Sequence, residues 1–432
     1  MADSRFKIFS DPVHGFISVP KNLILDLIQT PQVQRLRRIR QLGVGHLVFP
    51  GAEHTRFGHA LGAMALMHDA LASLSEKGTE ITPDEYTAAL AAALLHDIGH
   101  GPFSHTLEHE LIEGFAHEAM SRVFLTRLNE RFHGALDLAI AIFDDAYPRP
   151  FFHQLVSSQL DMDRLDYLRR DSFFTGVVEG RVGVERIIKT LRVHPLDGGP
   201  DAEIVIESKG IYAAENFILA RRLMYWQVYL HKTVLAGDQL LRAILRRVRQ
   251  RLLADGLDLG GSEALLFFLR RTVRHDQIDR PDVVQAFAAL DDTDILFSLK
   301  QWMRSTDPIL ADLARRFIER DFFRVTFLPE PPSAELLDAW RGHIADWLVR
   351  QGLASPSQAA AEAAFYLILD RSHHAAYERA EAGIRVLGRD GVVRELSEST
   401  DTSAIATQTH SVIKPYVCYP RDAALADVLP TR

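Results

Sequence analysis

TPDEYTAALAAALLHDIGHGP occupies residues 82–102 and decides the fold, because it combines a helix start, a buried helix and a sharp helix end. Threonine followed three residues later by glutamate forms a capping box, and the proline at the first helical position supports the same start. Residues 88–95 are alanine or leucine throughout, so we expect a central helix that is buried on all sides. The glycine-rich turn after residue 97 ends this helix.

The His96-Asp97 pair at the end of this helix indicates a metal site. Burying charged side chains requires a compensating partner, and a divalent cation would supply one. His59 and Asp163, from two other segments, are candidates to complete the set. Two imidazoles and two carboxylates suit one divalent ion and leave positions open for water and phosphate oxygen. The alternative is that these are unconnected polar residues of a large helical protein.

The segment around His59 predicts a second helix of the same bundle. Thr55 is the expected N-cap of a helix that runs over 56–77 and stops at Gly78. His59 would then lie in the first helical turn, at the mouth of the bundle. Arg56, three residues earlier, would share its face.

The segment around Asp163 is rich in charge. Residues 159–171 read QLDMDRLDYLRRD, and its acidic and basic side chains are spaced so that several of them can pair. A helix that presents Asp163 to the other candidate ligands is one interpretation. A solvated helix whose charges neutralise each other is the alternative.

Composition favours a soluble cytoplasmic enzyme. The chain has 432 residues, of which 47% are hydrophobic, so a large core can form. No apolar run reaches the ~18 residues of a membrane span, and the N-terminus lacks the apolar region of a signal peptide, so no membrane partner is expected. The single cysteine, Cys418, fits a reducing compartment.

The formal net charge of −8 argues against nucleic acid as a partner. A phosphate-binding site in such a protein must therefore be locally basic. The candidates for this basic patch are Arg35, Arg37, Arg38, Arg40, Arg221 and Arg222. The alternative is that these arginines lie on solvated helix faces.

Periodicity predicts a mostly α-helical fold with a small α+β part at the C-terminal end. We expect helices at 56–77, 83–97, 105–128, 133–145, 152–171, 211–250, 262–273, 282–303 and 308–320, and a strand within 201–207. The proline-rich stretch 328–333 is the clearest linker, so we expect a helical domain over 1–327 and a small α+β domain over 328–432. Within the second domain we expect helices at 334–350 and 356–363, a strand at 365–370 and a hairpin at 383–393.

Taken together, these stretches resemble the HD-domain superfamily of metal-dependent phosphohydrolases, and more closely its deoxynucleoside triphosphate (dNTP) triphosphohydrolase branch. The resemblance covers residues 7–327 and implies an HD-domain helical bundle. Its further motifs are DPVHG at 11–15, TPQVQRLRRIRQLG at 30–43 and YLHK at 229–232. The sterile-alpha-motif accessory domain of a mammalian member is not expected, because the pattern starts within the first dozen residues.

The resemblance implies hydrolysis of a dNTP to deoxynucleoside and inorganic triphosphate, by attack of water on the α-phosphorus. The implied cofactor is one divalent metal ion, which could be Zn, Fe, Mn, Ni or Mg. Two histidine ligands favour a transition ion over magnesium. The alternatives are a phosphohydrolase for another nucleotide or phosphoester, such as a monophosphate, and a catalytically idle nucleotide-sensing scaffold. The presence of all the motif residues weakens the scaffold interpretation.

The resemblance also assigns site residues. His105 and His117 match the general acid/base histidines, with Glu108 and Glu118 as their carboxylate partners. The positions that hold the substrate are matched by Gln41, Leu42, Arg56, His100, Arg164, Tyr167, Asp171 and Arg221. Arg164 replaces a lysine of the mammalian member, which keeps the charge but changes the hydrogen-bonding geometry.

A second nucleotide site and a homo-oligomer, either a dimer or a tetramer, are also implied. The mammalian member binds guanine nucleotides between subunits, at positions matched here by Lys7, Gln34, Arg37, Arg320 and Arg324. Gln29 stands where an aspartate reads guanine, and an amide can match only part of that pattern of donors. Ser10 replaces an asparagine. We therefore expect a dNTP rather than GTP as effector, and the alternative is that these residues simply face solvent.

Overall fold

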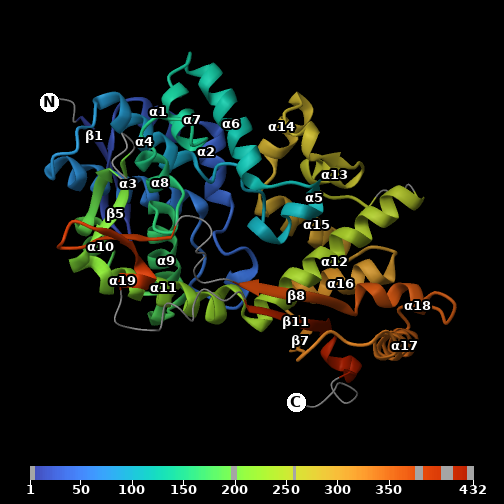
Figure 1. Cartoon of the computed structure of the whole chain (residues 1–432). Helices are drawn as coiled ribbons and strands as arrows, with labels where there is room; N and C mark the ends of the chain where they lie inside the picture. The colour runs from blue at the N-terminus through green and yellow to red at the C-terminus, as the bar shows by residue number, and fades with distance from the viewer. Residues whose placement is uncertain (1–4, 196–201, 256–258, 375–382, 400–411, 426–432) are drawn as a thin grey trace.

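The computed structural model describes residues 5–195, 202–255, 259–374, 383–399 and 412–425. The described chain is mostly helical, and its strands form small sheets (Figure 1). The predicted mostly α-helical class is therefore confirmed.

Helix α4 (Pro83–Leu95) lies at the centre of the N-terminal part, as the sequence predicts. It packs against α1 (Leu23–Ile28), α3 (Arg56–Glu76), α7 (Asp137–Phe143) and α8 (Phe151–Val156). Its alanine and leucine side chains are buried all round. The predicted capping box is present: the Thr82 side chain accepts from Glu85 N, and Thr82 N donates to the Glu85 carboxylate.

Four predicted helices are broken in the structure, and one of them, 282–303, divides between α14 (Pro281–Ala289) and α15 (Asp292–Trp302). Residues 105–128 form α5 (Glu108–Leu111), β3 (Ile112–Glu113) and α6 (His117–Arg131); residues 152–171 divide between α8 and α9 (Met162–Thr175); and residues 211–250 form α11 (Ile211–Met224), the π-helical turn Tyr225–Tyr229 and α12 (Lys232–Asp255). Backbone geometry explains the break within 105–128. Gly114, between β3 and α6, has φ +66°, and Phe103 and Ser104, just before residue 105, both have φ +52°. This region of backbone conformation does not continue a right-handed helix.

The remaining helices pack around these elements. In the N-terminal half they are α2 (Pro31–Arg35) and α10 (Val184–Thr190). Further along the chain they are α13 (Glu263–Leu269), α14 (Pro281–Ala289), α15 (Asp292–Trp302), α16 (Pro308–Ile318), α17 (Ala334–Arg350), α18 (Ala359–Glu362) and α19 (Leu396–Ser399). Helix α17 matches the predicted 334–350, whereas α18 is shorter than predicted.

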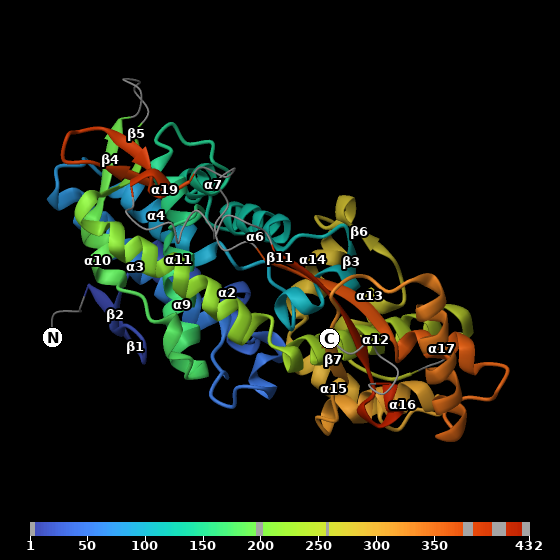
Figure 2. The same cartoon turned by 60° about the horizontal axis from the view of Figure 1, so that its bottom comes forward.

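Within the described residues, strands pair in four small sheets. β1 (Phe6–Asp11) and β2 (Gly15–Pro20) form an N-terminal hairpin; β4 (Leu191–Pro195), β5 (Ala202–Glu207), β9 (Arg385–Leu387) and β10 (Val393–Glu395) form a second sheet; β7 (Arg324–Phe327), β11 (Val412–Tyr419) and β8 (Ile368–His374) form a third; and β3 pairs with β6 (Val273–Arg274). Figure 2 shows β4, β5 and α19 at one end of the molecule and α17 at the other. The predicted strand near 201–207 and the hairpin at 383–393 are both present.

Strand pairing crosses the predicted boundary at residue 328 in both larger sheets. β7, which ends at Phe327, pairs with β11, and β9 pairs in parallel with β5. The C-terminal segment thus returns to the N-terminal part. The division into two domains stays a prediction. Among the described residues, none of the helices has both the length and the apolar character needed to cross a membrane.

Candidate active site

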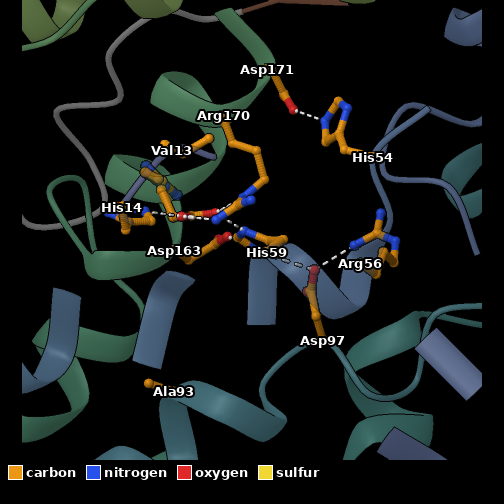
Figure 3. Close-up of polar contacts among 12 residues, drawn as sticks. Val13, His14, His54, Arg56, His59, Ala93, Asp97, Asp163, Arg170 and Asp171 are labelled. Carbon is orange, nitrogen blue, oxygen red and sulfur yellow. Dashed lines mark hydrogen bonds and ion pairs between the residues drawn. The ribbon is translucent and has the colours of Figure 1, made fainter. Parts of the chain in front are cut away.

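The structure brings His59, His96, Asp97 and Asp163 together. One potential ligand atom of each lies within 4.8 Å of the others. His59 Nε2 is 2.9 Å from Asp163 Oδ1 and 3.4 Å from His96 Nε2. His59 comes from the first turn of α3, His96 and Asp97 follow α4, and Asp163 lies in the first turn of α9 (Figure 3).

Local sequence explains how these side chains are held. Asp161 caps α9 by accepting from Arg164 N at 2.6 Å, which fixes the turn that carries Asp163. The turn after Asp97 runs directly against α6, and a Cβ on Gly99 would overlap the backbone of His117 and Ser121. Glycine is therefore required there for steric reasons.

Electrostatics favour a cation at this cluster. Burial opposes protonation of His59, but hydrogen bonds to Asp163 and Asp166 outweigh it and raise the His59 pKa to about 10. Burial likewise opposes protonation of His96, and the nearby carboxylates of Asp97 and Asp163 raise its pKa to about 9. The donor set fits a divalent metal ion: two buried imidazoles and two carboxylates converge, and together they attract positive charge.

Asp97 has a second partner. Arg56 donates through Nη1 to Asp97 Oδ2 and through Nε to Ser104 Oγ at 2.8 Å. Arg56 is buried. Its guanidinium bonds the Asp97 carboxylate, and the residue also lines the cavity described below. Thr55 precedes α3 as predicted, but its side chain makes no capping hydrogen bond.

Three histidines stand beside the ligand cluster. The rings of His100 and His117 stack with centroids 3.7 Å apart, and His105 meets both of them edge-on. Glu108 accepts from His105 Nδ1 at 2.9 Å and from His117 Nδ1 at 3.0 Å. Glu118 is 63% exposed and lies 3.4 Å from His117 Nε2. The expected His105–Glu108 pair is therefore present and Glu118 lies near His117, but Glu108 also bonds His117 and so orients both histidines.

A cavity of about 320 Å³ adjoins these groups. The predicted substrate residues Gln41, Leu42, Arg56, Tyr167 and Asp171 all line it, together with Tyr225 and Tyr229, which the π-helical turn presents. Arg164 and Arg221 come from α9 and α11 and both donate to Gln159 Oε1, at 3.2 and 3.3 Å.

Asp171 is held on both oxygens. Tyr229 Oη donates to Oδ2 at 2.7 Å. His54 Nε2 donates to Oδ1, also at 2.7 Å (Figure 3). The His54 ring stacks on Phe174. His54, Tyr225 and Tyr229 belong to this cavity or its surroundings but were not predicted as site residues.

The candidate effector residues divide between two regions. Lys7 lies on β1, and Gln34 Oε1 accepts from Arg37 Nε at 2.9 Å. Arg320 donates to Leu47 O at 2.6 Å, and Arg324 begins β7. Lys7, Arg37, Arg320 and Arg324 are all exposed.

Arg35 is not part of a basic surface patch, and its inclusion among the candidate phosphate ligands is wrong. Its guanidinium is buried and donates to the carbonyl oxygens of Leu290, Ile98 and His100. Burial lowers the Arg35 pKa to about 10. Arg35 therefore holds the turn after α4 against the loop between α14 and α15.

Comparison with known proteins identifies the class. The HD domain family model matches residues 56–145, and the model of the HD associated region matches 182–259. The uncharacterized protein YwfO of Bacillus subtilis is 34% identical over 435 residues, which cover 97% of this chain and 93% of that protein. The chain belongs to the HD-domain phosphohydrolase family, and it is an enzyme of that family.

Two further relatives bear on the activity. A phosphohydrolase crystal structure from Bacteroides thetaiotaomicron superposes with a TM-score of 0.89 at 44% identity and covers 96% of this chain and 100% of that one. The human deoxynucleoside triphosphate triphosphohydrolase SAMHD1 is 28% identical over 363 residues. That match covers 74% of this chain and 54% of the human protein, so the chain spans about half the length of SAMHD1.

Proposed function

We propose that this enzyme hydrolyses dNTPs to deoxynucleoside and inorganic triphosphate, with His59, His96, Asp97 and Asp163 holding one divalent metal ion. The observation that carries the proposal is the convergence of these four residues next to the histidine cluster and a cavity lined by tyrosines. The similarity to SAMHD1 supports the choice of substrate. When bound, the ion polarises a phosphoryl oxygen and lowers the pKa of water.

The arginines of the site bind the triphosphate in this proposal. Arg56 is fixed by Asp97 and Ser104, and Arg164 and Arg221 share Gln159. Guanidinium groups suit phosphate because their fixed fork of donors matches two oxygens at once. Arg56 bonds the ligand Asp97 directly, and Arg164 follows the ligand Asp163 in the chain. Together with Arg221 they would offset the negative charge of the substrate.

His117 is the proposed general acid. The 5′-oxygen of the deoxynucleoside leaves as an alcohol and needs a proton, which a histidine can supply near neutral pH. Glu108 holds Nδ1 of His117, while Nε2 lies 3.9 Å from Asp97 Oδ1 and thus faces the ligand cluster. His105, whose side chain is 69% exposed, shares Glu108 and can exchange protons with solvent.

Tyr229, Tyr167 and Asp171 form the proposed nucleoside end of the site. Asp171 accepts from His54 and Tyr229 and, as a carboxylate, keeps lone pairs for a sugar hydroxyl. The tyrosine rings meet edge to face and offer apolar surface to a sugar and base. Leu42 lines the same cavity opposite them.

Product analysis tests this proposal. The purified protein is incubated with each dNTP and Mn²⁺, and products are resolved by ion-exchange chromatography. Deoxynucleoside and triphosphate in equal amounts are expected. Orthophosphate or pyrophosphate as the primary product would contradict cleavage between the α-phosphorus and O5′ with release of intact triphosphate. Asp97→Asn is the matched inactive control, because it removes one negative charge from the ligand set without changing side-chain size.

We also propose a homo-oligomer, a dimer or a tetramer, that binds a nucleotide effector through Lys7, Gln34, Arg37, Arg320 and Arg324. The support is that four of these side chains are exposed cations and the fifth, Gln34, bonds one of them. Cations gathered between subunits would need an anion. Sedimentation velocity with and without each dNTP tests this. A monomer under all conditions, with kinetics unchanged by Arg37→Ala, contradicts it. A cytoplasmic location belongs to the same proposal, supported by the single cysteine in 432 residues.

A further inference from the structure

The DPVHG turn at residues 11–15 joins β1 to β2 and has no part in the chemistry described so far. Asp11 Oδ1 accepts from Val13 N and His14 N, each at 2.9 Å, which folds the turn tightly. Gly15 completes it with φ +75°, a conformation that glycine adopts without strain. The turn points its His14 side chain, only 8% exposed, into the molecule toward α9 (Figure 3).

The His14 side chain contacts the carboxylate of Asp166, which is completely buried. His14 Nε2 lies 2.6 Å from Asp166 Oδ1. Arg170 donates to the same carboxylate through Nη2 at 3.0 Å and through Nε at 2.9 Å, and it also reaches Asp11 Oδ2 at 2.9 Å. These two hydrogen bonds from a guanidinium hold Asp166 as a carboxylate. A carboxylate only accepts, so His14 Nε2 carries the proton.

The same carboxylate holds the metal ligand His59. Asp166 Oδ2 lies 2.7 Å from His59 Nδ1. Nδ1 must therefore donate to Asp166, which leaves the lone pair of Nε2 for a cation. His59 Nε2 faces His96 and Asp163, the other members of the ligand set. Outer carboxylates of this kind fix the tautomer and the ring orientation of metal-bound histidines.

Two glycines of helix α3 leave room for the Asp166 and Arg170 side chains. Gly58 and Gly62 flank His59 on the helix. A Cβ on Gly62 would overlap Asp166 Oδ1 and lie 2.5 Å from Arg170 Nη2, and a Cβ on Gly58 would lie 3.3 Å from Arg170 Nη1. Glycines inside a helix cost stability relative to alanine, so these two positions are explained by the space that the buried charges need.

We propose that His14 is a positioning residue of the metal centre: through Asp166 it holds His59 in the orientation that binds the divalent ion. The N-terminal hairpin thereby becomes part of the metal site, although it supplies no ligand. This inference rests on the metal site of the proposed function, but it does not depend on the identity of the substrate.

Docking of the hairpin and binding of the metal ion should strengthen each other. If docking of the DPVHG turn strengthens metal binding, metal binding must strengthen docking of the turn by the same free energy. Metal should therefore slow hydrogen exchange of the β1 and β2 amides. Phe16 and Ile8, on the outer face of the hairpin, are 79% and 63% exposed, so the hairpin has little other packing on that side to hold it.

The test measures Co²⁺ affinity by competition with a chelating dye, together with the visible absorption of the bound ion, in wild type and three variants. His14→Ala removes the donor. His14→Gln keeps a terminal N–H at a similar reach. His68→Ala removes an exposed histidine of α3 that bonds Tyr86 and serves as the control.

We expect His14→Ala to weaken Co²⁺ binding by ~10–100-fold and to change the absorption band, as for other outer-sphere partners of metal ligands. His14→Gln should recover part of the affinity, and His68→Ala should stay within about twofold of wild type. Slower exchange of the hairpin amides on metal addition should be lost in His14→Ala.

Unchanged Co²⁺ affinity in folded His14→Ala would overturn the inference and leave the metal site intact. If His14→Ala does not fold, hydrogen exchange of the wild type decides: slower exchange of the β1 and β2 amides on Co²⁺ addition supports the inference, and unchanged exchange overturns it. Failure of wild type itself to bind Co²⁺ would overturn both this inference and the metal assignment of the proposed function.

Discussion

Gly62→Ala should lower the free energy of unfolding, whereas glycine-to-alanine changes within helices usually raise it, because Gly62 packs against the buried Asp166 and Arg170. In an ordinary helix interior this change stabilises by up to ~1 kcal/mol, because alanine has the higher helix propensity. On α3 the new methyl group would overlap Asp166 Oδ1 and lie 2.6 Å from Asp166 Cγ. Overpacking of this kind costs ~1–3 kcal/mol, and displacing the carboxylate weakens hydrogen bonds to charged groups worth ~1.5–3 kcal/mol each.

The expected net result is a loss of about 2–4 kcal/mol in the free energy of unfolding, with weaker metal binding, from the overpacking and hydrogen-bond terms less the propensity gain. Gly342→Ala is the matched control: Gly342 lies within α17, is exposed, and a Cβ there meets nothing within 4 Å. That variant should be more stable than wild type. Urea unfolding of both variants without metal, followed by Co²⁺ titration, measures the two effects. Equal stabilisation by the two substitutions would refute the reasoning.

Two further substitutions test other parts of the account. His117→Ala should lower turnover by ~10²–10⁴-fold, the range for loss of a general acid or base, with metal content unchanged; a loss below about threefold would remove His117 from the mechanism. Glu85 is buried, which opposes its ionisation, but hydrogen bonds from Thr82 N, Arg149 and Tyr147 lower its pKa to about 2. A depressed pKa contributes stability above the unfolded value of ~4.3 that is lost as the pH falls toward 2. Urea unfolding of Glu85→Gln between pH 6 and 3 should therefore show less of this acid loss than wild type, and identical pH profiles would contradict the assignment.

The sequence predicts the centre of the fold well because the signals there are local. The Thr82–Glu85 capping box, the apolar run after it and the glycine turn are all encoded within about twenty residues, and α4 has these features. Helix α17 is predicted for the same reason. The breaks near Gly114 and at Tyr225–Tyr229 depend on how the chain packs around the site, and periodicity alone gives no signal for them.

The candidate site shows the same division. His59, His96, Asp97 and Asp163 could be predicted because each stands in a recognisable motif, and the structure gathers them. Their supports could not be predicted, because they join distant segments. His14 and Asp166 are 152 residues apart. Glu108 shows a subtler limit: its spacing predicts contact with His105, but its second bond to His117 depends on the turn between α5 and α6.

Attack of water on the α-phosphorus of a dNTP, at the site formed by His59, His96, Asp97 and Asp163, can be tested by hydrolysis in H₂¹⁸O followed by mass spectrometry of both products. We expect one ¹⁸O atom in the released triphosphate and none in the deoxynucleoside, because the bond between phosphorus and O5′ breaks. Label in the deoxynucleoside, or in released orthophosphate, would place the attack on another atom and contradict the proposed reaction.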